Sequence, residues 1–193
     1  MEDDAHNIFT GPPDGLGEEE FYFGTFVPGM GSMVNVEVAR AFAEAADRLM
    51  ETAAAQQESW EAAYPILFCY RHALELYLKS LLPERAQGHR LNDLVKSLKP
   101  YLDSRYPADQ VSWLTERIAE FDRIDPKSTV FRYPDGPATS YKSGEDPWPE
   151  TWVDFRRLQR VTTRIFNALE WLRLHRMDTG EPRQEERQRW IWD

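Results

Sequence analysis

The feature that most constrains the fold is an apolar segment, Tyr64 to Leu82, that carries a narrow stripe of charge. It is much longer than a typical strand, and Pro83 follows it directly, so it reads as one helix that ends by Leu82. At helical spacing its ionisable side chains share about a quarter of the circumference. They are Arg71, His72, Glu75 and Lys79. A helix so apolar on its other sides is central to a bundle or buried between subunits.

Further segments have the apolar spacing of three and four residues that is typical of amphipathic helices. The first runs from Val34 to about Gln57, with Asn35 or Ser32 as its N-cap. Its expected inward residues are Val38, Phe42, Ala45, Leu49 and Ala53. The apolar helix itself should begin at Ser59, because Pro65 then falls in its first turns, where proline is tolerated best.

Three more helices are expected after Pro83. One opens at Gly88 and His89 and halts near Pro100, with Leu91, Leu94, Val95 and Leu98 inward. The next covers about 108–123, with Val111, Leu114, Ile118 and Phe121 inward. The last runs over about 150–176, with an apolar stripe of Trp152, Phe155, Leu158, Ile165, Leu169 and Leu172.

Turn-forming residues divide the chain. Residues 1–33 are predicted to be an irregular, flexible acidic and aromatic arm, 34–176 the helical body, and 177–193 a C-terminal tail with Trp190 and Trp192. Between the last two helices, 124–149 contains five prolines and two glycines, and a loop of that length is often functional. The predicted fold is an all-α, up-and-down bundle of four to five helices.

Charge and cysteine content limit the function classes. The net charge is −10, yet eight acidic residues and no lysine or arginine precede Arg40, so the helical body is nearly balanced. Overall acidity disfavours non-specific coating of DNA but leaves room for a local basic surface. No charge-free apolar run is long enough to span a bilayer, and the N-terminus lacks a secretory signal. With Cys69 as the single cysteine, a cytoplasmic protein without membrane association is expected.

Two interpretations of the charged stripe stay open. Arg71–Glu75 and Glu75–Lys79 are spaced i,i+4, so they can pair on a solvent-facing seam, each pair contributing ~0.3–0.5 kcal/mol. Alternatively, the stripe binds a ligand or phosphate: Arg71 and Lys79 hold anionic oxygens, Glu75 orients them and His72 donates a proton. A metal site is disfavoured because His72 and Glu75 lack a suitably spaced third ligand, and no cofactor is expected.

Three short patterns and a closing helix form a recognisable set. They are YRHALELYLK at 70–79, GHRL at 88–91 and FRYP at 131–134, followed by a helix rich in leucine and arginine. Across about residues 60–175 this set resembles the HEPN superfamily, in particular bacterial HEPN-like proteins of unassigned role. The resemblance implies a bundle of four or five helices, commonly a homodimer. It also implies work on RNA or nucleotides, often in toxin–antitoxin or antiphage defence systems.

The chain departs from the ribonuclease members of that superfamily. Those carry an arginine, four to six further residues and a histidine on a late helix. Arg85 and His89 have only three residues between them, and the other histidines (His6, His72 and His175) follow no arginine at the required distance. The catalytic pair therefore has no counterpart, which favours a protein that does not catalyse rapidly. If the chain does cleave RNA, Arg71, His72 and Glu75 are the substitutes.

Two other features could serve binding. Arg132 and Tyr133 lie in the long loop, where they could grip a phosphate or stack on a base, although Phe131 and Tyr133 could equally anchor the loop to the bundle. On the last helix Arg157, Arg160 and Arg164, with Arg156 beside them, form a basic ridge that could meet phosphates, face solvent or pair with acids of another chain.

The resulting functional hypothesis is an HEPN-like protein that binds RNA, a nucleotide or a protein partner. One alternative is a metal-independent endoribonuclease with a non-standard arginine and histidine site, and another is a purely structural interaction module. A homodimer is expected from the nearly all-round apolar helix and the terminal tryptophans.

Overall fold

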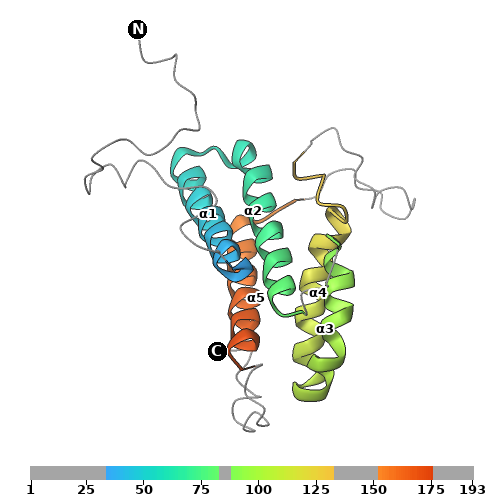
Figure 1. Cartoon of the computed structure of the whole chain (residues 1–193). Helices are drawn as coiled ribbons and strands as arrows, with labels where there is room; N and C mark the ends of the chain where they lie inside the picture. The colour runs from blue at the N-terminus through green and yellow to red at the C-terminus, as the bar shows by residue number, and fades with distance from the viewer. Residues whose placement is uncertain (1–33, 83–87, 133–151, 176–193) are drawn as a thin grey trace, which may run out of the picture. The chain divides into compact units, whose positions relative to one another are not determined.

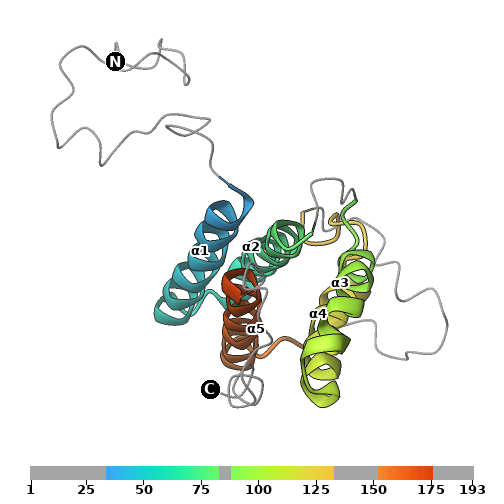
Figure 2. The same cartoon turned by 60° about the horizontal axis from the view of Figure 1, so that its bottom comes forward.

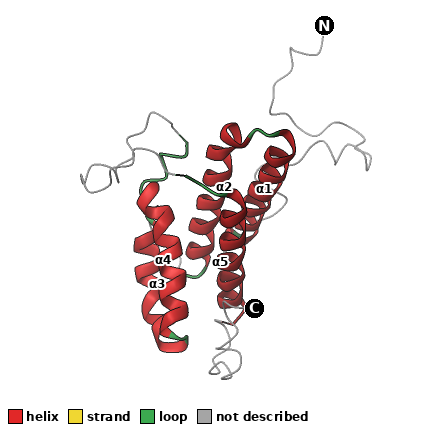
Figure 3. Ribbon diagram, turned by 180° about the vertical axis from the view of Figure 1, so that it is seen from behind, coloured by secondary structure: helices red, strands yellow, loops and turns green. Residues whose placement is uncertain are grey.

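The computed structural model describes residues 34–82, 88–132 and 152–175, and within these ranges it is helical without strands (Figures 1 and 3). The helices are α1 Asn35–Gln56, α2 Ser59–Ser80, α3 Leu91–Arg105, α4 Ala108–Ile124 and α5 Phe155–His175. The all-α bundle expected from the sequence is confirmed. All five helices belong to the unit Val34–Asp193. The predicted arm (1–33), the tail (177–193) and loop residues 133–149 lie outside the described residues.

The described residues of this unit form two helical hairpins and a fifth helix. Two-residue connections join α1 to α2 and α3 to α4, and α5 packs against α2 and α4 (Figure 2). Because α2 contacts α1, α3 and α5, most of its circumference is apolar. Contacts within one chain thus account for the feature that suggested burial between subunits. Among the described helices, none is long and apolar enough to span a membrane.

The helix boundaries differ from the sequence expectations at three places. At the start of α1, Val34 occupies the N-cap and its N–H donates to Glu37 Oε2 at 3.3 Å, so Asn35 is the first helical residue and not the cap. Ser32 lies outside the described residues. Helix α3 does not halt near Pro100 but continues to Arg105, since Leu98 and Leu102 on either side of the proline are both buried in the core.

The third difference concerns the last helix, which begins at Phe155 and not near Glu150. Trp152 precedes the helix and is 91% exposed, so its expected place in the inward stripe is wrong. The other members of that stripe are buried or partly buried against the core (Phe155, Leu158, Ile165, Leu169 and Leu172).

The orientation of α1 was also predicted incorrectly. Its buried residues are Val36, Ala39, Ala46, Met50 and Ala53. Of the expected inward set only Ala53 is fully buried, Val38, Phe42 and Ala45 are partly buried, and Leu49 is 37% exposed. On a helical projection the buried face is turned by about 90° from the expected one. The apolar arc of α1 is therefore wider than the arc that the described part of the chain covers.

Candidate functional site

Arg71, in the middle of α2, is fully buried, with 0% exposure. Its Nε donates to the carbonyl oxygen of Asp125 at 2.9 Å, and its Nη2 donates to the carbonyl oxygen of His89 at 2.6 Å. Its Nη1 donates to Glu75 Oε2 at 3.1 Å, one helical turn away. The guanidinium thus links the middle of α2 to the start of α3 and the end of α4, and a ligand could reach it only after these segments had separated.

Glu75 is the centre of the same cluster and is also buried. Its Oε1 accepts from Lys79 Nζ at 2.8 Å and lies 2.7 Å from His89 Nδ1. Burial by itself raises the pKa of the Glu75 carboxyl, but the hydrogen bonds from Lys79, His89 and Arg71 outweigh it and lower the pKa below its ordinary value. The carboxylate is therefore ionised, and His89 must carry a proton on Nδ1 to bond to it.

Asp125 closes the cluster from the end of α4. Its Oδ1 accepts from the backbone N–H groups of Thr129 (2.7 Å) and Val130 (3.0 Å), and its Oδ2 lies 3.5 Å from Arg71 Nε. These bonds fold residues 125–130 into a tight turn. Phe131 then enters the core, which is the anchoring role considered for it. The first part of the predicted long loop is thus attached to the bundle.

We call Arg71, Glu75, Lys79, His89 and Asp125 the buried ion network, after its three buried members, Arg71, Glu75 and Asp125; the side chains of Lys79 and His89 are 20% and 69% exposed. Its two formal positive charges, on Arg71 and Lys79, face two negative ones, on Glu75 and Asp125. An anion would have to compete with carboxylates already bound at short distances. The network is suited to holding three helices in register and poorly suited to binding phosphate through Arg71.

His72 and Arg132 lie beside this network in an aromatic setting. The His72 imidazole stacks on Phe68 at 5.7 Å and meets Phe42 edge-on at 4.5 Å between ring centroids. The Arg132 guanidinium lies 5.9 Å from the centroid of the Phe68 ring and donates through Nε to the carbonyl of Ser128. Burial is the main cause that lowers the pKa of His72 below 6.5. Its ring is therefore neutral at pH 7 and packed as an aromatic group.

Sequence reasoning brought Arg71, Glu75 and Lys79 together correctly but missed His89 and Asp125 as members of the network. They lie 14 and 54 positions from their partners, so no helical spacing could reveal them. For His89 the available signals were its place at the opening of a helix and its membership of the GHRL pattern at 88–91. Tyr133, the second predicted loop residue, lies outside the described residues.

The second candidate site is the arginine face of α5, which consists of Arg156, Arg157, Arg160 and Arg164. All four side chains are exposed. They span about 100° of the helix circumference and about 12 Å of its length. Among the residues that the structure describes, none of the four guanidinium groups has a carboxylate within ion-pairing distance, in contrast to Arg40 and Arg173, which both pair with Glu170.

Two residues flank the N-terminal end of this face. Asp154 Oδ1 accepts from the backbone N–H of Arg157 at 3.0 Å. This bond is the main cause that lowers the pKa of Asp154, and the charges of Arg160 and Arg156 act in the same direction. Asp154 therefore caps the helix and offsets one of four positive charges. Trp152 presents its exposed indole just before the helix.

Comparison with models of known protein families, with curated proteins and with solved structures finds no match for this chain. The resemblance to the HEPN superfamily therefore stays a prediction from residues 60–175. Any functional conclusion depends on the geometry of the two candidate sites.

Proposed function

We propose that the chain is a binding protein for single-stranded RNA and that the arginine face of α5 is its phosphate-binding surface. The observation that carries the proposal is the exposure of Arg156, Arg157, Arg160 and Arg164 on one face without a carboxylate partner in the described residues. Positive charge in a line along an otherwise acidic protein attracts a polyanion and holds it mainly through phosphate contacts.

A single strand is favoured over a duplex for two reasons. A flexible strand can lay successive phosphates along one helix, whereas an A-form RNA duplex has a major groove too deep and narrow for side chains to read. Trp152, four residues before Arg156 in the sequence and 91% exposed, offers a plane on which an unpaired base can stack. Its partner base must be unstacked, which is the usual state of single-stranded RNA that proteins recognise.

The test is fluorescence anisotropy with a labelled RNA oligonucleotide at several salt concentrations. For single strands each lost phosphate contact reduces the slope of log K against log salt by about 0.7, and Arg160→Ala and Arg164→Ala should each do so. At low salt each should weaken binding on the order of fivefold. Trp152→Ala should weaken binding without changing the slope, because stacking releases no counterions.

The matched control is Arg173→Ala. It removes an arginine from the same helix, but one that pairs with Glu170 outside the arginine face. An equal loss in Arg173→Ala would show that only net charge matters and would contradict the proposal, as would wild-type protein that does not bind RNA.

The same samples separate the alternatives. RNA cleavage in EDTA that disappears in His72→Ala would establish the endoribonuclease. A protein that does not bind RNA, but whose melting temperature rises when another protein is added, would establish the interaction module.

A further inference from the structure

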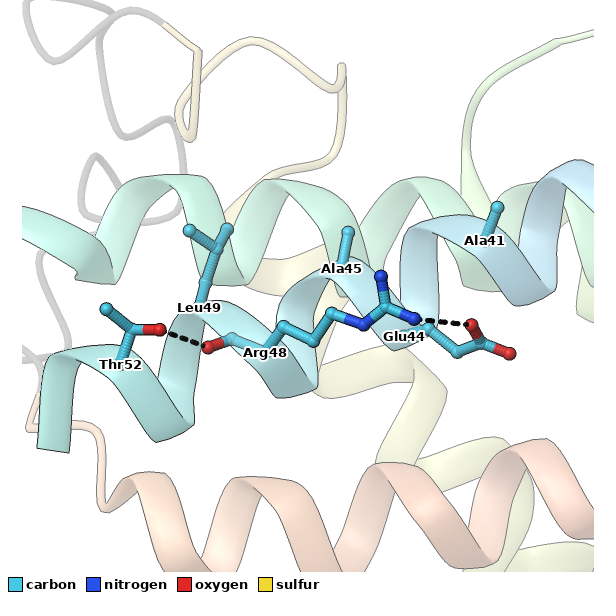
Figure 4. Close-up of a pocket in the computed structure, with 6 residues that line it drawn as sticks. All are labelled: Ala41, Glu44, Ala45, Arg48, Leu49 and Thr52. Carbon is cyan, nitrogen blue, oxygen red and sulfur yellow. Dashed lines mark hydrogen bonds and ion pairs between the residues drawn. The ribbon is translucent and has the colours of Figure 1, made fainter. Parts of the chain in front are cut away.

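Helix α1 has an apolar face that the described part of the chain leaves partly open. Val38, Phe42 and Ala45 on this face are partly buried, with the Phe42 ring against Phe68 and His72 of α2. Leu49 on the same face is 37% exposed. Next to the Phe42 contact a shallow groove runs along α1, lined by Ala41, Glu44, Ala45, Arg48, Leu49 and Thr52 (Figure 4).

Opposite charges lie on one flank of this groove. Glu44 and Arg48 are spaced i,i+4 and their closest charged atoms are 3.6 Å apart, with side chains 66% and 79% exposed (Figure 4). An exposed pair of this kind adds little to the stability of its own helix. It does give the flank one negative and one positive position at neighbouring turns.

We propose that a second copy of this chain occupies the groove, with the two α1 helices antiparallel about a two-fold axis near Ala45. In an antiparallel pair the same flank of both helices meets, so Glu44 of each copy faces Arg48 of the other. This register also places Leu49 of each copy over the notch between Ala41 and Ala45 of its partner. One register thus satisfies the charges and fills the groove at both symmetry-related positions.

A parallel pair does not meet these conditions. It would bring the Glu44 and Arg48 flank against the opposite flank of the partner helix, where Ala39, Ala46 and Ala53 are buried in the partner's own core. The antiparallel arrangement is therefore the self-complementary one. The proposal is independent of RNA binding, because α1 and the arginine face of α5 share no residue.

Charge reversal tests the register on the full chain by sedimentation equilibrium. Wild type should associate to twice the chain mass of 22.6 kDa. Glu44→Arg and Arg48→Glu each place like charges opposite each other twice per dimer, so each should raise the dissociation constant on the order of tenfold. The double variant should recover wild-type affinity. An equimolar mixture of the two single variants should form a heterodimer tighter than either variant alone, because all facing charges are then opposite.

The matched control is Asp103→Lys, which reverses one charge of an exposed i,i+4 pair on α3 and should leave association unchanged. Circular dichroism should show that every variant keeps its helices, since the changed side chains are exposed. A wild-type monomer at the highest concentration, or a dimer that the single reversals do not weaken, would overturn the proposal.

Discussion

At the scale of single residues, Arg71 has a structural role that its chemistry alone would not reveal. Every nitrogen of its guanidinium group has an acceptor inside the protein, and two of those acceptors are backbone carbonyls from other parts of the chain. Removing the cation would leave Glu75 and Asp125 as buried negative charges with fewer donors. Breaking such a group is far more harmful than losing an exposed ion pair.

Arg71→Met is therefore expected to lower the free energy of unfolding by about 3–5 kcal/mol, since methionine retains much of the volume but none of the donors. Urea unfolding followed by circular dichroism measures the change. Lys99→Met, which removes the exposed ion pair with Asp103, should lower it by less than about 1 kcal/mol. Similar losses in the two variants would show that the buried ion network contributes no more than a surface pair.

His72 gives a prediction about pH. Burial, with smaller contributions from the charges of Arg71, Lys79 and Arg132, lowers its pKa in the folded state, and only Glu75 opposes the shift. Protons therefore bind more tightly to this residue in the unfolded chain. The neutral His72 ring contributes fully to the free energy of unfolding above its pKa in the unfolded chain, about 6.5. This contribution is lost as the pH falls through the lower pKa of His72 in the folded protein.

An NMR titration should accordingly show that the His72 imidazole is half protonated at a pH below 6.5. The variant His72→Phe keeps an aromatic ring between Phe42 and Phe68 but cannot be protonated. Between pH 7 and pH 5 it should lose less stability in urea than wild type does. A midpoint above 6.5 would instead mean that Glu75 dominates the environment of the ring.

At the scale of elements, α3 continues through a proline because tertiary packing outweighs local preference. Pro100 has no N–H to donate to the carbonyl of Lys96, and its ring crowds that carbonyl. The residue itself is exposed, while Leu98 and Leu102 hold the helix against the core. Local sequence signals favoured a stop at this position, and the burial of the following turn overrides them.

Pro100→Ala should therefore raise the free energy of unfolding, on the order of 1–3 kcal/mol, because alanine restores the hydrogen bond. Thermal unfolding and urea unfolding both measure this increase in the free energy of unfolding. Pro107→Ala is the control: Pro107 occupies the N-cap of α4, where no such bond is missing, and no gain is expected. If Pro100→Ala does not stabilise the protein, the proline ring does not strain α3.

At the scale of the whole molecule, charge is divided between two uses. The buried ion network neutralises itself and holds α2, α3 and α4 together. The arginine face of α5 keeps its charge on the surface, in a chain whose net charge is −10. This division is the reason that we place RNA binding on α5 and not on the conspicuous charged stripe of α2.

By itself, the sequence determined the helical class, the approximate extent of each described helix and the pairing of Glu75 with Arg71 and Lys79, because periodicity and i,i+4 spacing are local properties. It also indicated the basic ridge of α5. Only the tertiary structure decided which side of α1 is buried, since the apolar arc of that helix allows more than one orientation. It alone brought His89 and Asp125 to Arg71, because contacts between distant segments depend on how the helices pack.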